Sequence, residues 1–145
     1  MGRTLEAITV LKQRELEDIP YELIRLYIVS LRALLDGNRR ESLEIAEQAI
    51  SSHFLGPEEL FYFARQIAYL GEQERVLAVL RQAIDGGFFC VPALTRDPWL
   101  DPLRTQAGFQ DLLQRAQARH REALIAFNAE GGDRVLGVSC QPRVS

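Results

Sequence analysis

The chain of 145 residues carries 17 basic and 20 acidic side chains, which gives a formal net charge of -3. Both signs of charge are spread along the sequence without a basic block, so we do not expect a nucleic acid as a partner. The longest apolar stretch, Leu23 to Leu35, contains two arginines and is shorter than the ~20 residues that a membrane span needs, which predicts no membrane insertion.

The first ninety residues predict five amphipathic helices separated by turn residues. Pro20 and Pro57 each stand in the first turn of an expected helix, where proline costs no hydrogen bond. Gly37 and Gly71 each stand where a helix is expected to end. The expected helices span residues 4–17, 20–35, 39–52, 57–70 and 72–85.

The C-terminal third predicts short capped turns followed by one long helix. Asp97 and Asp101 each precede a proline, and each is expected to cap a short helical turn. Trp99, between them, is expected to close the end of the core. The long helix has one apolar stripe backed by a fully polar face, which is what the last helix of a stack requires. The stripe consists of Phe109, Leu112, Leu113, Ala116, His120, Ala123, Leu124 and Phe127.

Two segments of the chain repeat one another at an offset of 34 residues, the spacing between Gly37 and Gly71. A period of this length is typical of a helix–turn–helix unit that cannot bury its apolar face alone and must stack on a copy of itself. No alternating strand pattern competes, so the fold class is predicted to be all-α. The matched pairs include Leu26 with Leu60, Leu43 with Leu77, Ala49 with Ala83 and Phe54 with Phe88.

The repeated segments resemble tetratricopeptide repeats, a family whose unit places large, small and glycine residues at fixed positions. Phe54 and Phe88 stand where that family has proline. The resemblance implies a tetratricopeptide-repeat-like (TPR-like) α-α superhelix of stacked antiparallel helix pairs with a C-terminal capping helix. It divides the chain into one domain, residues 1–130, and a tail, residues 131–145. The domain begins with one helix of a partial unit, residues 1–18, which is followed by the two repeats, residues 19–54 and 55–90. A degenerate unit with the capping helix, residues 91–130, completes it. The matching positions are Leu26, Val29, Ser30, Gly37, Ser42 and Ala49 in the first repeat, and Leu60, Phe63, Ala64, Gly71, Val76 and Ala83 in the second.

A second resemblance concerns residues 86–90 followed by 97–104. These are similar to the C-terminal ends of repeat arrays attached to bacterial serine/threonine kinases and related signalling regulators. The resemblance implies the C-terminal sensing or docking part of a larger bacterial signalling protein. The sequence itself contains no Gly-rich phosphate loop and no His-Arg-Asp or Asp-Phe-Gly motif.

In such arrays the first helix of each unit lines a concave groove, which implies a surface for a protein or peptide. Aromatic and arginine side chains are well suited to anchor such a partner, and Arg65 is expected to orient it through a carboxylate or a backbone carbonyl. One alternative is that neighbouring helices of the same domain cover these side chains. A second alternative is a homodimer, because the helix from Leu23 to Leu35 is apolar nearly all round. The candidate residues are Tyr27, Leu31, Leu34, Leu35, Phe61, Tyr62, Arg65 and Tyr69.

Catalysis has weaker support in the sequence, and we expect no enzyme, no cofactor and no metal. Cys90 and His120 could be proposed as a nucleophile and a base, but no local motif supports them. Cys90 is expected to be a small core side chain, and His120 a hydrogen-bonded core residue. Cys140 lies in the tail, far from Cys90, and the N-terminus lacks a signal-peptide pattern. These features favour a soluble protein in a reducing, cytoplasmic compartment.

Overall fold

The computed structural model describes residues 2–17, 21–52 and 55–137, and within these ranges the only regular elements are helices. The predictions made for Pro20, Phe54 and Cys140 lie outside the described residues. The all-α prediction is confirmed for the described part of the chain. The elements are α1 (Gly2–Glu15), α2 (Glu22–Leu35), α3 (Arg39–Ser51), α4 (Pro57–Tyr69), α5 (Gln73–Gly86), α6 (Val91–Arg96), the 3-10 helix η1 (Pro98–Leu103), α7 (Ala107–Ala129) and α8 (Gly132–Leu136).

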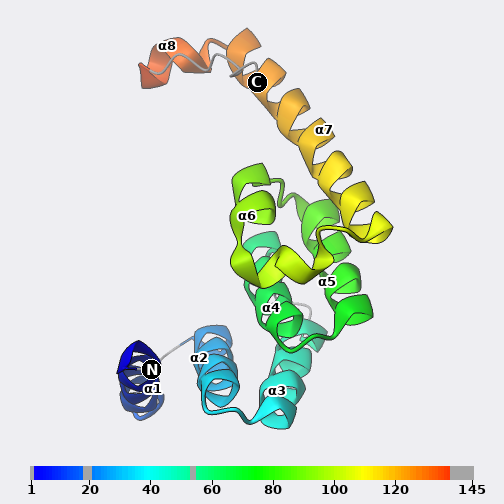
Figure 1. Ribbon diagram of the computed structural model, residues 1–145. Helices are drawn as coiled ribbons and strands as arrows, with labels where there is room; N and C mark the ends of the chain where they lie inside the picture. Colours follow the sequence, from blue (N-terminus) through cyan, green and yellow to red (C-terminus); the bar gives the residue numbers. More distant parts are fainter. Residues whose placement is uncertain (1, 18–20, 53–54, 138–145) are drawn as a thin grey trace.

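The helices pack as pairs, α2 with α3 and α4 with α5, and the two pairs lie side by side (Figure 1). Small side chains sit where helices approach one another closely, because only they leave room for the neighbouring backbone. Ala49 and Ala83, at equivalent positions of the two repeated segments, are both fully inaccessible to solvent, as predicted. The other small side chains at 0% exposure are those of Ser30, Ala33, Ser42, Ala46, Ala64, Val76 and Ala116.

The two turns inside the helix pairs have the same conformation. Gly37 and Gly71 adopt φ of 82° and 81°, the left-handed region in which glycine has no steric penalty. After each glycine the next backbone N–H turns back to a free helix carbonyl: Asn38 N–H donates to Ala33 O at 2.8 Å, and Glu72 N–H to Ile67 O at 3.3 Å. This arrangement satisfies carbonyls that the helix end would leave unpaired. The predicted helix ends are therefore confirmed at both positions.

One buried polar contact joins the two pairs. The Ser30 hydroxyl donates to Gln66 Oε1 at 2.6 Å, and the backbone oxygen of Ser42 lies 2.9 Å from the same hydroxyl. All three residues are fully buried, so this contact gives the interface between the pairs a directional interaction in its interior.

The segment after the second pair packs back onto α4 through η1. Asp97 caps η1, as predicted, by accepting the Trp99 N–H at 3.0 Å. Asp101 caps no turn of its own: it lies inside η1 and pairs with Arg104 at 2.8 Å, because the chain continues through Pro102 without a break. The side chains that fill the core here are Leu94, Leu100 and Leu103.

The predictions for Trp99 and Cys90 are wrong. Trp99 is half-buried beside Tyr69, with ring centroids 5.0 Å apart, while the leucines that flank it in η1 occupy the core. Cys90 is exposed, because it stands at the N-cap position of α6 where the chain leaves the core. The short helix α6 was not predicted as a separate element, since six residues are too few to show a helical period.

Only the first half of α7 packs as a capping helix. Phe109, Leu112 and Ala116 are buried, whereas His120 is exposed, which corrects its prediction as a core residue. The reason is that α5 ends beneath the middle of α7, where the Arg119 guanidinium donates to Asp85 O at 3.0 Å. Beyond this point α7 extends past the rest of the fold and is followed by α8, which lies within the predicted tail (Figure 1).

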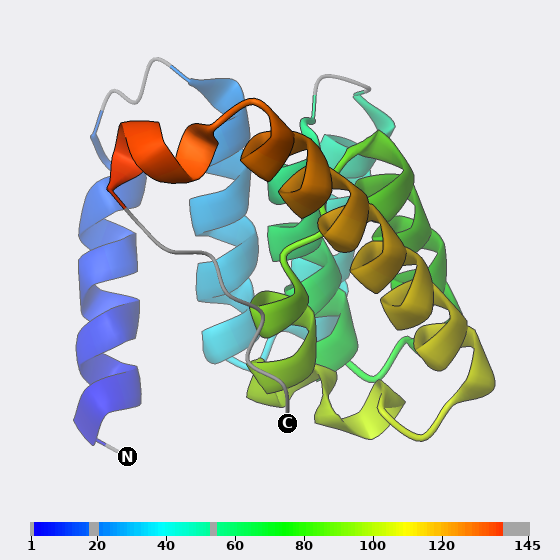
Figure 2. The ribbon, with the colours of Figure 1, turned by 90° about the horizontal axis from the view of Figure 1, so that it is seen from above.

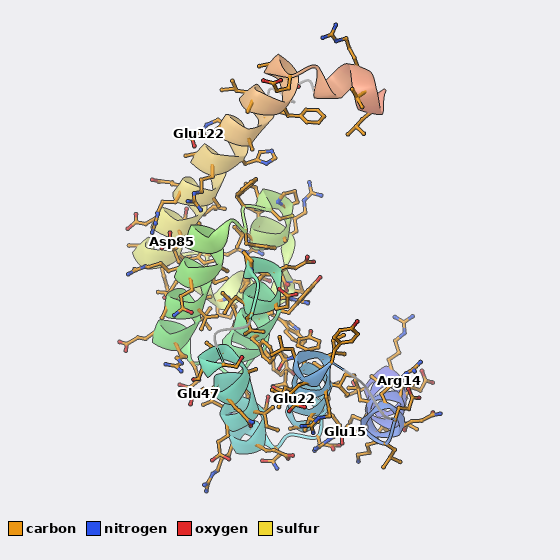
Figure 3. All side chains as sticks on the ribbon, turned by 180° about the vertical axis from the view of Figure 1, so that it is seen from behind. Arg14, Glu15, Glu22, Glu47, Asp85 and Glu122 are labelled. Carbon is orange, nitrogen blue, oxygen red and sulfur yellow. The ribbon has the colours of Figure 1, made fainter. Side chains whose placement is uncertain are left out.

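Helix α1 lies beside α2 (Figure 2), and two ion pairs join them, Glu15 with Arg32 at 2.8 Å and Lys12 with Asp36 at 3.4 Å. Arg32 of α2 donates from Nε to Glu15 Oε1 of α1 at 2.8 Å and from Nη2 to Glu41 Oε1 of α3 at 2.8 Å. Figure 3 shows Glu15 between α1 and α2. Hydrogen bonds to Glu41 and Glu15 raise the pKa of Arg32 further above its already high ordinary value, so the side chain is always charged. In α1 the apolar side chains of Ile8 and Leu11 are only half-buried, and no described side chain of this helix is buried.

Among the described helices, none combines the length and the apolar character that crossing a bilayer would demand.

Candidate protein-binding groove

Some of the predicted binding residues are covered by other parts of the chain, and others line a groove. Leu34 and Phe61 are buried, at 5% and 4% exposure, so the expectation that they face a partner is wrong. The Phe61 ring stacks on Phe88 with centroids 4.4 Å apart, because the chain after α5 returns across this face of α4. Leu31 and Leu35 are half-buried on α2. For these positions the chain itself supplies most of the cover.

Arg65 is also engaged within the chain. Its guanidinium forms an ion pair with Asp97 and lies 5.0 Å from the centroid of the Trp99 ring, an arrangement that combines charge pairing with a cation–π contact. The Asp97 side chain is only 8% exposed. Tyr69 remains 55% exposed beside the same tryptophan. Arg65 therefore fixes η1 onto α4. The carboxylate that Arg65 was expected to find on a binding partner is supplied by Asp97 of the same chain.

Tyr27 and Tyr62, the remaining predicted residues, lie together in a groove with a cavity volume of about 840 Å³. The N-terminal halves of α2 and α4 form its two sides, and the end of α3 and the start of the following segment close it. This volume is within the range of sites that enclose most of a ligand's surface. The lining residues are Tyr21, Glu22, Leu23, Ile24, Leu26, Tyr27, Gln48, Ser52, Leu55, Glu59, Tyr62 and Phe63.

The wall of the groove is built from contacting aromatic rings. Tyr27 lies edge-on to Phe63, with centroids 5.5 Å apart and an interplanar angle of 82°, and its ring is 5.9 Å from that of Tyr62. Phe63 is 1% exposed and belongs to the main core, so this wall is continuous with the packed interior. Edge-to-face ring pairs have a preferred geometry, which makes the wall a firm surface.

The rim of the groove keeps large apolar side chains in contact with solvent. Tyr21 is 69% exposed, Ile24 50% and Tyr62 38%. Exposed apolar groups that gather around a concavity are typical of interaction sites, whereas single exposed apolar residues are ordinary on any surface. Tyr21 and Ile24 were not among the predicted residues.

The charged groups at the rim are mostly acidic. Glu22 pairs with Arg25 at 2.5 Å, and the hydrogen bond from Arg25 lowers the pKa of Glu22. The Tyr62 hydroxyl donates to Glu58 at 2.9 Å, and this bond raises the pKa of Tyr62. Glu59, at the third position of α4, makes no ion pair with any described residue.

The sequence prediction did not include Tyr21 and Ile24 at the rim of the groove, and the reason is geometric. It took the concave face from equivalent positions of the repeated helices, and these positions point toward the middle of α2 and α4. The groove instead opens at the N-terminal ends of both helices. The spacing of Tyr21, Ile24 and Tyr27, three residues apart each time, is the signal that could have found it, since this spacing places side chains along one face of a helix.

Among the described residues no group of three or more His, Cys, Asp or Glu side chains is placed to hold a metal ion. Cys90 lies at the start of α6 and His120 on the distal half of α7, and the structure forms no hydrogen bond between them. The side chains of the groove can supply apolar contact, hydroxyl groups and negative charge.

Comparison with protein-family models, with curated proteins and with solved structures found no match for this chain.

Proposed function

We propose that this chain is a non-enzymatic, TPR-like module that binds a segment of another protein in the groove between α2 and α4. The observation that carries the proposal is the apolar cavity of about 840 Å³, whose wall is packed firmly while its rim leaves large apolar side chains exposed. Exposing such groups to water is unfavourable unless a partner covers them. We further propose that the module acts in the cytoplasm as part of a bacterial signalling assembly.

The superhelical description is part of this proposal. It is supported by the identical turns at Gly37 and Gly71 and by the burial of small residues at equivalent positions of both helix pairs. Stacks of helix pairs serve widely as surfaces for other polypeptides, and they carry no built-in chemistry. Function on such a scaffold therefore resides in the side chains that the stack leaves accessible.

The test is a pair of identical substitutions at two exposed isoleucines. Ile24→Glu places a charge at the groove rim, whereas Ile125→Glu places it on the distal half of α7, where the side chain is 69% exposed. We expect Ile24→Glu to weaken partner binding roughly 30-fold or more, the effect of losing one apolar anchor, and Ile125→Glu to leave binding unchanged. The measurement is quantitative co-purification of partners with each tagged variant, with helical content checked by circular dichroism.

Equal capture by wild type and Ile24→Glu, with both variants folded, would rule out the groove as the binding surface. Substitution of Phe61 is unsuitable for this test, because its burial makes loss of the fold the dominant effect.

Self-association is the second candidate, and the distal arm of α7 and α8 favours it. Ile125, Val135 and Leu136 are 69%, 82% and 64% exposed there, away from the groove. If two copies join through these arms, sedimentation at micromolar concentration will show a dimer for wild type and Ile24→Glu but a monomer for Ile125→Glu. A monomer in all three cases would exclude this function. The same two variants thus separate the two candidates.

A further inference from the structure

The groove combines an apolar interior with a rim of negative charge, and this combination selects among possible partners. Glu22 and Glu59 line the groove at the N-terminal ends of two helices, and Glu58 accepts the hydroxyl hydrogen bond of Tyr62, which lines it too. Arg25 is the basic group that pairs with Glu22. We propose that the groove takes an amphipathic helical segment whose apolar anchors are flanked by lysine or arginine. This inference rests on the proposed function and names the chemistry of its partner.

The positions of the acids have an ordinary structural role as well, because carboxylates at helix N-termini interact favourably with the helix dipole. Two features go beyond that role. Acids from two separate helices border the same cavity, and Glu59 lines it without an ion pair to any described residue. Glu59 is therefore available to a cationic group that arrives from outside.

Arg25 does not neutralise the rim as a whole. It is bound to Glu22 through two nitrogens, at 2.5 Å and 3.1 Å, so its charge is committed to one of the three carboxylates. The remaining rim charge repels an acidic peptide and also an anionic lipid, whose apolar chain the cavity would otherwise suit. Charge complementarity thus favours a basic segment over both.

A helical partner fits this fold better than an extended one. Extended peptides usually add to the free edge of a sheet, and the described residues contain no strand to provide such an edge. A groove between helices instead accepts the apolar face of another helix, with anchors at positions i, i+3, i+4 and i+7. Gln48 and Ser52 at the α3 side of the groove can hydrogen-bond to the polar flank of such a helix.

The experiment compares two labelled peptides of about 18 residues, long enough to be helical when bound. Both carry leucine at i, i+3, i+4 and i+7; one has lysine on its polar flanks and the other glutamate at the same places. Fluorescence anisotropy with the full chain is expected to show binding of the lysine peptide that is about 3- to 10-fold tighter, as two exposed ion pairs would give. High salt should reduce the difference in affinity between the two peptides, because salt screens the charges.

The matched variants are Glu59→Gln at the rim and Glu122→Gln on α7, where the side chain points away from the groove (Figure 3). We expect Glu59→Gln to reduce the preference for lysine and Glu122→Gln to leave it unchanged. Ile24→Glu should weaken binding of both peptides, which confirms that they occupy the groove.

Any of the following outcomes would overturn the inference that the partner is a basic amphipathic helix. Equal binding of the two peptides that is lost in Ile24→Glu would show an apolar groove without charge selection. Tighter binding of the glutamate peptide, or of an anionic fluorescent fatty acid, would show that the rim does not repel negative charge. If neither peptide binds while Ile24 is still required for partner capture, the partner class is wrong and the proposed function stands.

Discussion

Replacing Phe63 by alanine is expected to lower the free energy of unfolding by about 3–5 kcal/mol, the typical cost of deleting a buried aromatic side chain. Phe63 is 1% exposed, lies within the main core and also forms the groove wall against Tyr27. The substitution removes apolar contact from the core and leaves a cavity that the rigid helix pairs can only partly close. Urea denaturation followed by circular dichroism measures the change.

A second variant supplies the control. Ile125→Ala removes a large apolar side chain that is 69% exposed, and we expect a change within about 0.5 kcal/mol. A loss below about 1 kcal/mol for Phe63→Ala would mean that this part of the interface is loosely packed, which would contradict the description of a firm groove wall.

Replacing Arg32 by methionine is expected to release α1 from the rest of the fold. Arg32 holds Glu15 and Glu41 at once, at 2.8 Å each, and its side chain is 16% exposed. Hydrogen bonds between charged groups contribute about 1.5–3 kcal/mol when partly shielded, and methionine keeps the apolar stem while removing the charge. Because no described side chain of α1 is buried, apolar packing alone offers little to retain the helix.

Hydrogen–deuterium exchange measures this release directly. We expect amide protection in residues 2–15 to fall by at least tenfold in Arg32→Met, with α4 and α5 unchanged. Arg25→Met is the matched control, since Arg25 pairs only with Glu22 of its own helix. Protection of α1 that survives in Arg32→Met would show that the apolar contacts of Ile8 and Leu11 and the Lys12–Asp36 ion pair are sufficient to hold it.

The elements that local chemistry determines could be predicted from the sequence. A glycine followed by a polar residue ends α2 and α4, and proline begins α4, because these residues restrict the backbone at their own positions. The 34-residue repeat then predicts that Ala49 and Ala83 face a neighbouring helix, and both are buried. Helix bounds and the pairing of helices follow from such short-range and periodic signals.

Exposure of a given side chain could not be predicted in the same way, since it depends on what lies opposite. His120 continues the stripe of Phe109 and Ala116, yet α5 ends before reaching it. Phe61 occupies a groove position in the repeat pattern, but the segment after α5 covers it with Phe88. The groove itself is formed by residues from three helices, and no single stretch of sequence contains its shape.

The two helix pairs differ at the equivalent positions of Arg32 and Gln66, and this difference favours one order of the pairs. Arg32 and Gln66 are 34 residues apart, and each contacts a helix that comes before its own pair: Arg32 donates to Glu15 of α1, and Gln66 accepts from the Ser30 hydroxyl of α2. Exchanging the pairs would place the Arg32 guanidinium beside Ala64, which stands at the position equivalent to Ser30, and would leave Glu15 facing a neutral amide. The stack therefore has a defined first and second member, although both pairs turn at a glycine of the same conformation.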